Sequence, residues 1–205
     1  MKRILIAAVV GFCFSMPTVA QQKGTIEYGL NAGYNSATVS TEDNTADYGD
    51  GFNVGFSADY YFSNRWSIKA KLIYDQKGWN RGFIRNLDTG DTYTTNFNLD
   101  YITIPVLANW HFAKKRNWYL NFGPYVGFLM SAKETRFGMN VKEGFNTTDF
   151  GFGVGVGVKI PVSDKLKISL EYETQSGFTE IFKESIKPIT NTRWSLNFGV
   201  NFLLK

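Results

Sequence analysis

The stretch FGFGVGVGVKIP, residues 150–161, alternates strictly between large apolar residues and small or polar ones. Side chains of a β-strand point alternately to its two faces, so this segment is predicted to be a strand with one bulky face and one nearly bare face. The bulky face begins with Phe150 and Phe152 and continues through three valines to Ile160. The bare face consists of Gly151, Gly153, Gly155, Gly157 and Lys159.

Seven further segments show the same period of two, and no mature segment of ten or more residues has a convincing helical period. These seven strands are expected at about residues 25–39, 51–62, 66–78, 97–112, 118–132, 166–176 and 192–204. Tight turns at 63–65, 113–117 and 162–165 alternate with polar loops at about 40–50, 79–96, 133–148 and 177–191. This layout predicts an all-β fold, an eight-stranded antiparallel up-and-down transmembrane β-barrel with both termini on the periplasmic side.

The charged residues of the strands indicate which face meets lipid. A soluble, lipocalin-like barrel would have to enclose about 40 to 50 large apolar groups, more than eight strands can hold. A barrel in a bilayer reverses this arrangement, because hydrocarbon cannot solvate polar atoms. We therefore expect lipid against the apolar faces, and a crowded lumen in which glycines admit long side chains and charges pair. The charged residues of the polar face are Glu27, Asp59, Lys69, Lys71, Asp75, Lys159, Lys167, Glu171, Glu173 and Arg193.

The five tryptophans support the same orientation. Trp66, Trp110 and Trp118 flank short turns, whereas Trp79 and Trp194 stand beside long loops. Membrane barrels carry aromatic girdles at both interfaces, so all five are expected there.

The chain begins with a basic Met-Lys-Arg, an apolar run to Met16 and a small-residue site ending at Ala20. This is typical of a cleaved signal peptide; the run is too short for a spanning helix. We expect a signal peptide at residues 1–20 and a barrel domain at 21–205. The only cysteine, Cys13, follows Phe12, which disfavours lipidation, and cleavage would leave a chain without disulfides. The mature balance of 20 basic and 18 acidic residues does not favour nucleic acid.

No catalytic, cofactor-binding or metal-binding residues are predicted. Glu171 and Glu173 share a face as a hydrolase pair would, but structural pairing with Lys and Arg is favoured. His111, the sole histidine, falls by a periplasmic turn, away from the outer rim where a lipid-acting enzyme would work. The run GFGVGVG has no helix after it, which disfavours a phosphate loop. The acidic loop lacks calcium-binding spacing; its residues are Glu42, Asp43, Asp47 and Asp50.

Three local features carry expectations of their own. The basic turn Lys114–Arg116 either ends a strand in water or contacts anionic headgroups of the inner leaflet. Pro105 cannot donate to a ladder, so a bulge is expected there. A surface ligand is expected first at the loop containing Trp79, Arg81, Phe83, Ile84 and Arg85.

Residues 99–107 read LDYITIPVL, and residues 123–127 read GPYVG. In the fourth and fifth strands of an exported chain, these motifs resemble Bacteroidetes outer-membrane β-barrels of the porin-family or PorT-like group. The sequence departs from that pattern at Thr103 and Asn109, where the family often carries charge, and at the terminal Leu204-Lys205. The resemblance implies an outer-membrane location and, for most members, no established activity. The final strand resembles a recognition signal for the barrel-assembly machinery.

The resulting hypothesis is a non-enzymatic outer-membrane barrel with a filled lumen and a structural, surface or small porin-like role. The alternatives are a narrow transport channel, a PorT-like subunit of a secretion apparatus and a lipid-acting enzyme. The expected partners are outer-membrane lipid, the assembly machinery during insertion, and a surface ligand or envelope partner at the long loops, with no cofactor and no nucleic acid.

Overall fold

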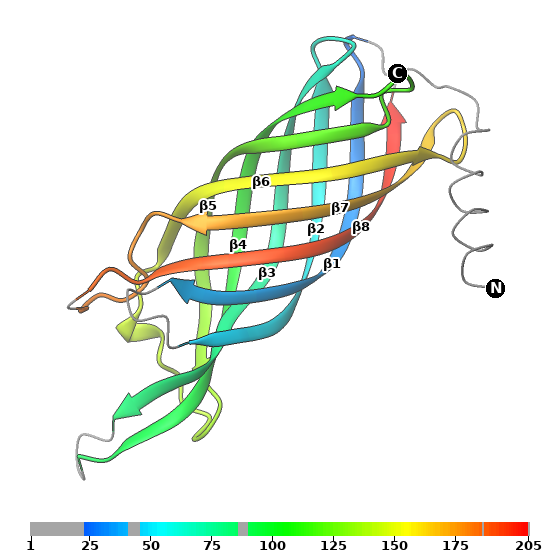
Figure 1. Ribbon diagram of the computed structural model, residues 1–205. Helices are drawn as coiled ribbons and strands as arrows, with labels where there is room; N and C mark the ends of the chain where they lie inside the picture. Colours follow the sequence, from blue (N-terminus) through cyan, green and yellow to red (C-terminus); the bar gives the residue numbers. More distant parts are fainter. Residues whose placement is uncertain (1–22, 41–45, 86–89, 186, 205) are drawn as a thin grey trace, which may run out of the picture.

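The computed structural model of the protein describes residues 23–40, 46–85, 90–185 and 187–204. Each strand pairs antiparallel with the next and the last pairs with the first, so the sheet closes into a barrel (Figure 1). This confirms the predicted fold. The strands are β1 (Ile26–Ser40), β2 (Asp47–Tyr61), β3 (Trp66–Arg85), β4 (Thr92–Phe112), β5 (Trp118–Glu134), β6 (Thr148–Pro161), β7 (Leu166–Gly177) and β8 (Thr190–Leu204), with a short 3-10 helix η1 (Lys142–Gly144) between β5 and β6.

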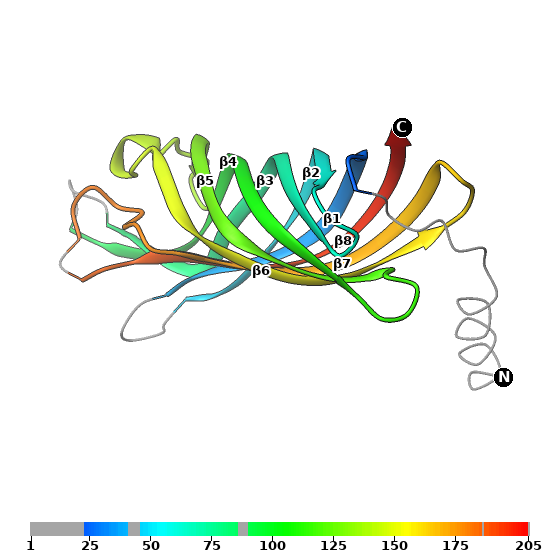
Figure 2. The same ribbon diagram turned by 90° about the horizontal axis from the view of Figure 1, so that it is seen from above.

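The predicted alternation of short and longer connections is present, but the loop expected at 79–96 is shorter than predicted, because β3 continues to Arg85 and β4 begins at Thr92. The three short turns lie at the end of the barrel where β8 finishes, and the longer connections lie at the opposite end (Figure 1). In Figure 1 and Figure 2, strands on the near side of the barrel cross those on the far side, as expected for strands that are inclined to the barrel axis. The expected signal peptide, including Cys13, lies outside the described residues, as do Glu42 and Asp43.

Burial follows the predicted parity of the strands. Large apolar side chains of the outer face are exposed, for example Leu72 at 53% and Leu196 at 56%, whereas the charged residues of the opposite face are buried. A protein in water would not leave such a continuous apolar band uncovered. The band is therefore the surface that meets lipid.

The bare face of β6 makes room for the side chains of β5. A Cβ built on Gly151 would lie 2.7 Å from the Tyr125 hydroxyl oxygen, and one on Gly157 would lie 2.5 Å from the Tyr119 hydroxyl oxygen. Both tyrosines are almost completely buried in the lumen. The missing side chains of these glycines thus leave the space in which the interior tyrosines lie, as predicted.

Aromatic residues gather at both ends of the lipid-facing band. At the short-turn end Trp66 contacts Trp110, with ring centroids 6.4 Å apart, and Phe112 lies between Trp110 and Trp118. At the other end Trp194 contacts Tyr34 and Tyr172.

Trp79 does not belong to either girdle, so that prediction was wrong. It lies within β3, with its side chain only 4% exposed, and stacks on Phe97 inside the barrel. The strand continues to Arg85 in a region expected to be loop, and the alternation from Asp75 through Lys77 carries Trp79 to the inner face.

The bulge predicted at Pro105 was likewise wrong. The register between β4 and β5 shifts at Asp100/Tyr101, where Ser131 and Leu129 are the partners and Met130 is the extra residue. Pairing with β3 lapses opposite Pro105 and then resumes in the same register. A missing N–H donor is therefore accommodated by a gap in the ladder and needs no inserted residue.

Over the described residues, no helix has the length and apolar character needed to cross a bilayer.

Candidate functional site

The most distinctive feature of the interior is a balanced set of buried charges. Six carboxylates and six cations of the described strands take part in ion pairs inside the lumen, so their formal charges cancel; Glu134, at the outer end of β5, is buried outside this network. Each of the paired groups is at most 6% exposed. Burying an isolated charge in such surroundings is very costly, so every one of these groups requires a partner of opposite sign. The carboxylates are Glu27, Asp59, Asp75, Asp149, Glu171 and Glu173, and the cations are Lys69, Lys71, Lys77, Lys159, Lys167 and Arg193.

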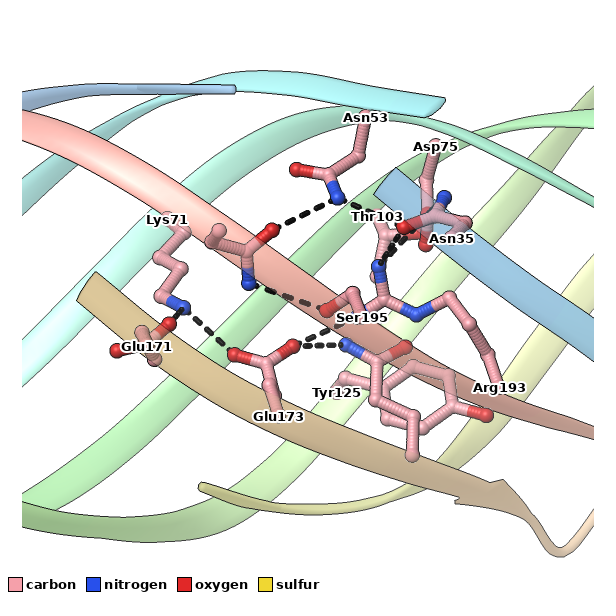
Figure 3. Close-up of polar contacts among 12 residues, drawn as sticks. Asn35, Asn53, Lys71, Asp75, Thr103, Tyr125, Glu171, Glu173, Arg193 and Ser195 are labelled. Atoms are coloured by element: carbon pink, nitrogen blue, oxygen red, sulfur yellow. Dashed lines mark hydrogen bonds and ion pairs between the residues drawn. The ribbon is translucent and has the colours of Figure 1, made fainter. Parts of the chain in front are cut away.

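The centre of the lumen is crossed by a chain of ion pairs. Lys71 Nζ donates to Glu171 and lies 2.6 Å from Glu173 Oε2. Arg193 Nη2 lies 2.6 Å from Glu173 Oε1, and its Nη1 lies 2.9 Å from Asp75 Oδ1. Figure 3 shows Glu173 between Lys71 and Arg193, with Asp75 against the same guanidinium group. The five groups thus alternate in sign across the barrel, and Lys69, whose Nζ lies 3.4 Å from Glu171 Oε2, supplies the third cation that balances the three carboxylates.

Two smaller clusters occupy the rest of the lumen. Towards the short turns, Lys159 Nζ lies 2.7 Å from Asp59 Oδ2 and 2.5 Å from Glu27 Oε1. Glu27 also accepts from Lys167 at 2.7 Å. Towards the long loops, Lys77 Nζ lies 2.9 Å from Asp149 Oδ2.

The space beside the central chain of ion pairs is small. A cavity beside Lys71, Glu171, Glu173 and Arg193 has room for about one water molecule. An eight-stranded barrel is just wide enough for its own side chains. The arrangement suits a solid, ionic core better than an aqueous path.

At the long-loop end an apolar cluster closes the barrel above the charges. Trp79, Phe97 and Leu99 from the wall meet Phe145 and Ile181 from two different loops, and all five are buried. The loops are joined by an isolated bridge between Phe145 and Phe182 and by a 2.8 Å bond from Asn146 N to the Ile181 carbonyl. We call this cluster the apolar plug. It was missed at the sequence level because its loop residues follow no period.

A hairpin formed by the outer ends of β3 and β4 extends beyond the neighbouring strands (Figure 1). Pairing with β2 ends at Asn80 and pairing with β5 ends at Phe97, so the pairs from Gly82–Thr95 to Arg85–Thr92 have no other strand beside them. Isolated two-stranded hairpins are marginally stable and need support.

The turn after β5 supplies that support. The Arg136 guanidinium lies over the Tyr93 ring at 4.9 Å, and Phe137 meets the same ring edge-on. Glu134 accepts bonds from Thr95 Oγ1 at 2.8 Å and from the backbone N–H of Arg136 at 2.8 Å and Met139 at 2.9 Å.

Glu134 lies six residues beyond Phe128, the last β5 residue paired with β6, and is thus outside the lipid-facing band. Burial works to raise the pKa of Glu134, but the bonds from the Met139 backbone and the Thr95 hydroxyl outweigh it and lower the pKa. The carboxylate is therefore the ionised anchor of this turn.

The sequence-level candidates for chemistry fall into structural positions. Glu171 and Glu173 are paired with Lys69, Lys71 and Arg193, as expected. His111 is fully buried at the short-turn end, with Nε2 3.1 Å from Ser67 Oγ and between tyrosine rings. Across the described part of the chain, no group of three or more His, Cys, Asp or Glu side chains is placed to hold a metal ion.

The loop expected to bind a surface ligand divides into two parts. Trp79 belongs to the buried plug, whereas Arg81, Phe83 and Arg85 are exposed on the projecting hairpin, Phe83 at 63%.

Two lumen charges, Lys77 and Asp149, were not among the predicted set. Each lies two residues from a residue already assigned to the inner face, Lys77 after Asp75 and Asp149 before Gly151. The alternation of the strands would therefore have predicted both as lumen charges.

A lipid-facing closed barrel with an ionic interior is an outer-membrane β-barrel. The family model described as outer membrane protein beta-barrel domain matches residues 19–183, and the chain belongs to this family. Among solved structures, Neisserial surface protein A is similar, with 18% identity, a TM-score of 0.52, and coverage of 85% of this chain and 96% of that one. OprG from Pseudomonas aeruginosa is similar at 10% identity and the same TM-score, covering 92% and 99%. No curated protein matches the sequence significantly.

These matches establish the bacterial outer membrane as the location and confirm the predicted class of protein. At such low identity the two structures show a shared fold only. In outer-membrane barrels the short turns face the periplasm and the long loops face outward. The apolar plug and the projecting hairpin therefore lie on the cell surface.

Proposed function

We propose that this protein is a sealed, non-enzymatic surface barrel, in which the lumen is a structural core and the exposed loops carry the biological role. The observation that carries this proposal is the chain of ion pairs from Glu171 through Lys71, Glu173 and Arg193 to Asp75. A hydrated ion could pass only by displacing these groups. Each displaced group would then be a buried charge without its partner.

The projecting hairpin supports a surface role. Its exposed Phe83 and Arg85 stand clear of the barrel, and Arg136 packs over the Tyr93 ring of the paired strand. A strand pair that is ordered before binding loses less conformational freedom on binding than a flexible one. The similar Neisserial protein is, by its name, a surface protein.

The proposal is tested by conductance in planar bilayers, with a general porin in the same lipid as the positive control. The wild-type barrel is expected to be silent over a range of voltages. A Glu173→Ala, Arg193→Ala double variant leaves the net charge unchanged and removes two large side chains from the lumen, so it is the matched variant for an opened path. Discrete current steps from the wild-type protein would overturn the sealed-lumen proposal and favour the narrow channel.

Finer assignments are proposed on the sequence motifs. The motifs LDYITIPVL and GPYVG support the Bacteroidetes porin-family or PorT-like group, for which co-purification with a large envelope complex would be the supporting result. Export through a cleaved signal peptide predicts a mature chain that begins at Gln21, which N-terminal sequencing would reveal. The proposal of no enzymatic activity predicts unchanged lipid profiles in a deletion strain.

A further inference from the structure

The periplasmic end of the barrel carries a strong charge imbalance, unlike the lumen. We call this end the basic rim and define it as the first described residues, 23–25, together with the turns 62–65, 113–117 and 162–165. These segments contain six cations and one carboxylate, Asp164. The cations are Lys23, Arg65, Lys114, Lys115, Arg116 and Lys165.

The geometry of the turns fixes the positions of these cations. In the β2–β3 turn, Ser63 Oγ accepts from the backbone N–H of Arg65 at 3.2 Å and of Trp66 at 2.9 Å. The β6–β7 turn repeats the arrangement, with Ser163 Oγ accepting from Lys165 N and Leu166 N. Each turn thus presents a cation two residues after a capping serine.

The third turn is linked to the first. Arg116 has a positive φ of 54° and its backbone N–H donates to the Ala113 carbonyl. Its Nη1 donates to the Asn64 carbonyl at 3.1 Å, across the gap between the β4–β5 and β2–β3 turns. Two of the three turns that carry these cations are therefore joined directly at this end of the barrel.

The depth of the rim is set by the aromatic girdle beside it. Trp66 directly follows Arg65, and Trp118 follows the turn 113–117 by one residue; both rings face outward and are partly exposed. Tryptophan rings of such girdles sit at the level of the lipid headgroups. The rim cations consequently lie at the height of the inner-leaflet phosphates, where each cation is attracted to anionic lipid.

We propose that the basic rim selects anionic phospholipid headgroups, of the phosphatidylglycerol type, in the inner leaflet of the outer membrane. The lipid is favoured over a soluble acidic partner because the cations encircle the barrel directly beside the girdle. A cell-wall polymer is the competing partner, and the experiment below separates the two.

Quenching of tryptophan fluorescence by brominated lipid measures this selection. In a Trp194→Phe protein, the lipid-exposed tryptophans are Trp66, Trp110 and Trp118, all at the basic rim, while Trp79 is shielded inside the plug. We expect brominated phosphatidylglycerol to be preferred over brominated phosphatidylcholine by about three- to fivefold at low salt. The preference should fall towards one in about 0.5 M NaCl, which screens charges over a few ångströms.

Two variants with equal loss of charge locate the effect. Lys114→Gln, Lys115→Gln and Lys165→Gln in one protein should abolish the preference, and heat-modifiable gel migration would verify folding. Arg81→Gln, Arg85→Gln and Lys183→Gln, on the extracellular loops, should leave it unchanged.

A preference near one in the Trp194→Phe protein, or one retained by the rim variant or insensitive to salt, would overturn the proposal. Charge-dependent sedimentation with purified sacculi, without selection among lipids, would assign the rim to the cell wall instead. The salt titration needs no rim variant, so it decides the question even if that variant fails to fold.

Discussion

Replacing single glycines of β6 by alanine tests whether the lumen is as crowded as its geometry indicates. Gly153→Ala and Gly157→Ala are the same change on the same face of one strand. A Cβ at Gly153 would lie 3.5 Å from Gln175 Cγ, an ordinary contact. At Gly157 it would lie 2.5 Å from the Tyr119 hydroxyl oxygen and 2.8 Å from the Leu170 carbonyl oxygen.

The two substitutions should differ in sign. Gly153→Ala reduces the freedom of the unfolded chain without steric cost, which stabilises by ~0.4–1 kcal/mol. Gly157→Ala gains the same term but must displace Tyr119, which is fully buried, and a backbone carbonyl of the neighbouring strand. Overpacking of this kind costs ~1–3 kcal/mol. We expect the free energies of unfolding to differ by about 2 kcal/mol, or about 30-fold in the unfolding constant.

Reversible urea unfolding in lipid vesicles, followed by tryptophan fluorescence and by gel migration, measures the difference. Gly155→Ala should resemble Gly157→Ala, because its Cβ would meet Asn121 and lie 2.9 Å from the Tyr172 carbonyl oxygen. Equal free energies for the three variants, or greater damage from Gly153→Ala, would refute the view that the glycines accommodate interior side chains.

Three further changes probe the ionic core, the plug and the hairpin support. Lys71→Met removes the shared partner of Glu171 and Glu173 and should cost about 3–5 kcal/mol in urea unfolding. Arg81→Met removes a pair whose arginine is 71% exposed and should cost at most about 1 kcal/mol, so similar costs would contradict the buried network. Phe145→Ala should expose the surface loops to protease while leaving gel migration unchanged, whereas Met139→Ala, at a half-exposed site, should not; equal cleavage of both would argue against the plug. Because the folded pKa of Glu134 is lowered, its contribution is complete above the usual value of 4.5 and declines as the pH falls through and below it. The protection factors of residues 135–139, which compare each measured hydrogen-exchange rate with the intrinsic rate at the same pH, should therefore fall in acid, and Glu134→Gln should remove this pH dependence. A fall of the same size in the variant would assign it to another group.

The feature that the sequence predicts best is which face of the sheet each strand residue points to. Alternation places each side chain on one of two faces, and the buried charges of β3 and β7 can face lipid only at great cost, so both the fold and its orientation follow from local pattern. The same parity, extended by two residues from Lys77, would have placed Trp79 inside. The error came from ending the strand too early, at a glycine with a positive φ that the structure retains within β3.

The apolar plug and the hairpin support were beyond the reach of pattern. Phe145 and Ile181 lie in loops without periodicity, and their neighbours Trp79 and Phe97 are distant in sequence. Likewise, the contact of Arg136 with Tyr93 depends on how far two strands project past their neighbours. Such contacts depend on the three-dimensional arrangement of distant segments, which the alternation of residues along one strand does not reveal.

The ion pairs of the lumen mostly join strands that are not neighbours in the sheet. Lys71 of β3 meets carboxylates of β7, Lys159 of β6 meets Glu27 of β1, and Arg193 of β8 reaches Asp75 of β3. Backbone hydrogen bonds link each strand to the next and can form one hairpin at a time, whereas these ion pairs connect opposite walls of the barrel. They can form only when the sheet has closed, and separating β1 from β8 would strain several of them together. The ion pairs therefore stabilise the closed barrel as a whole and contribute little to a partly assembled sheet.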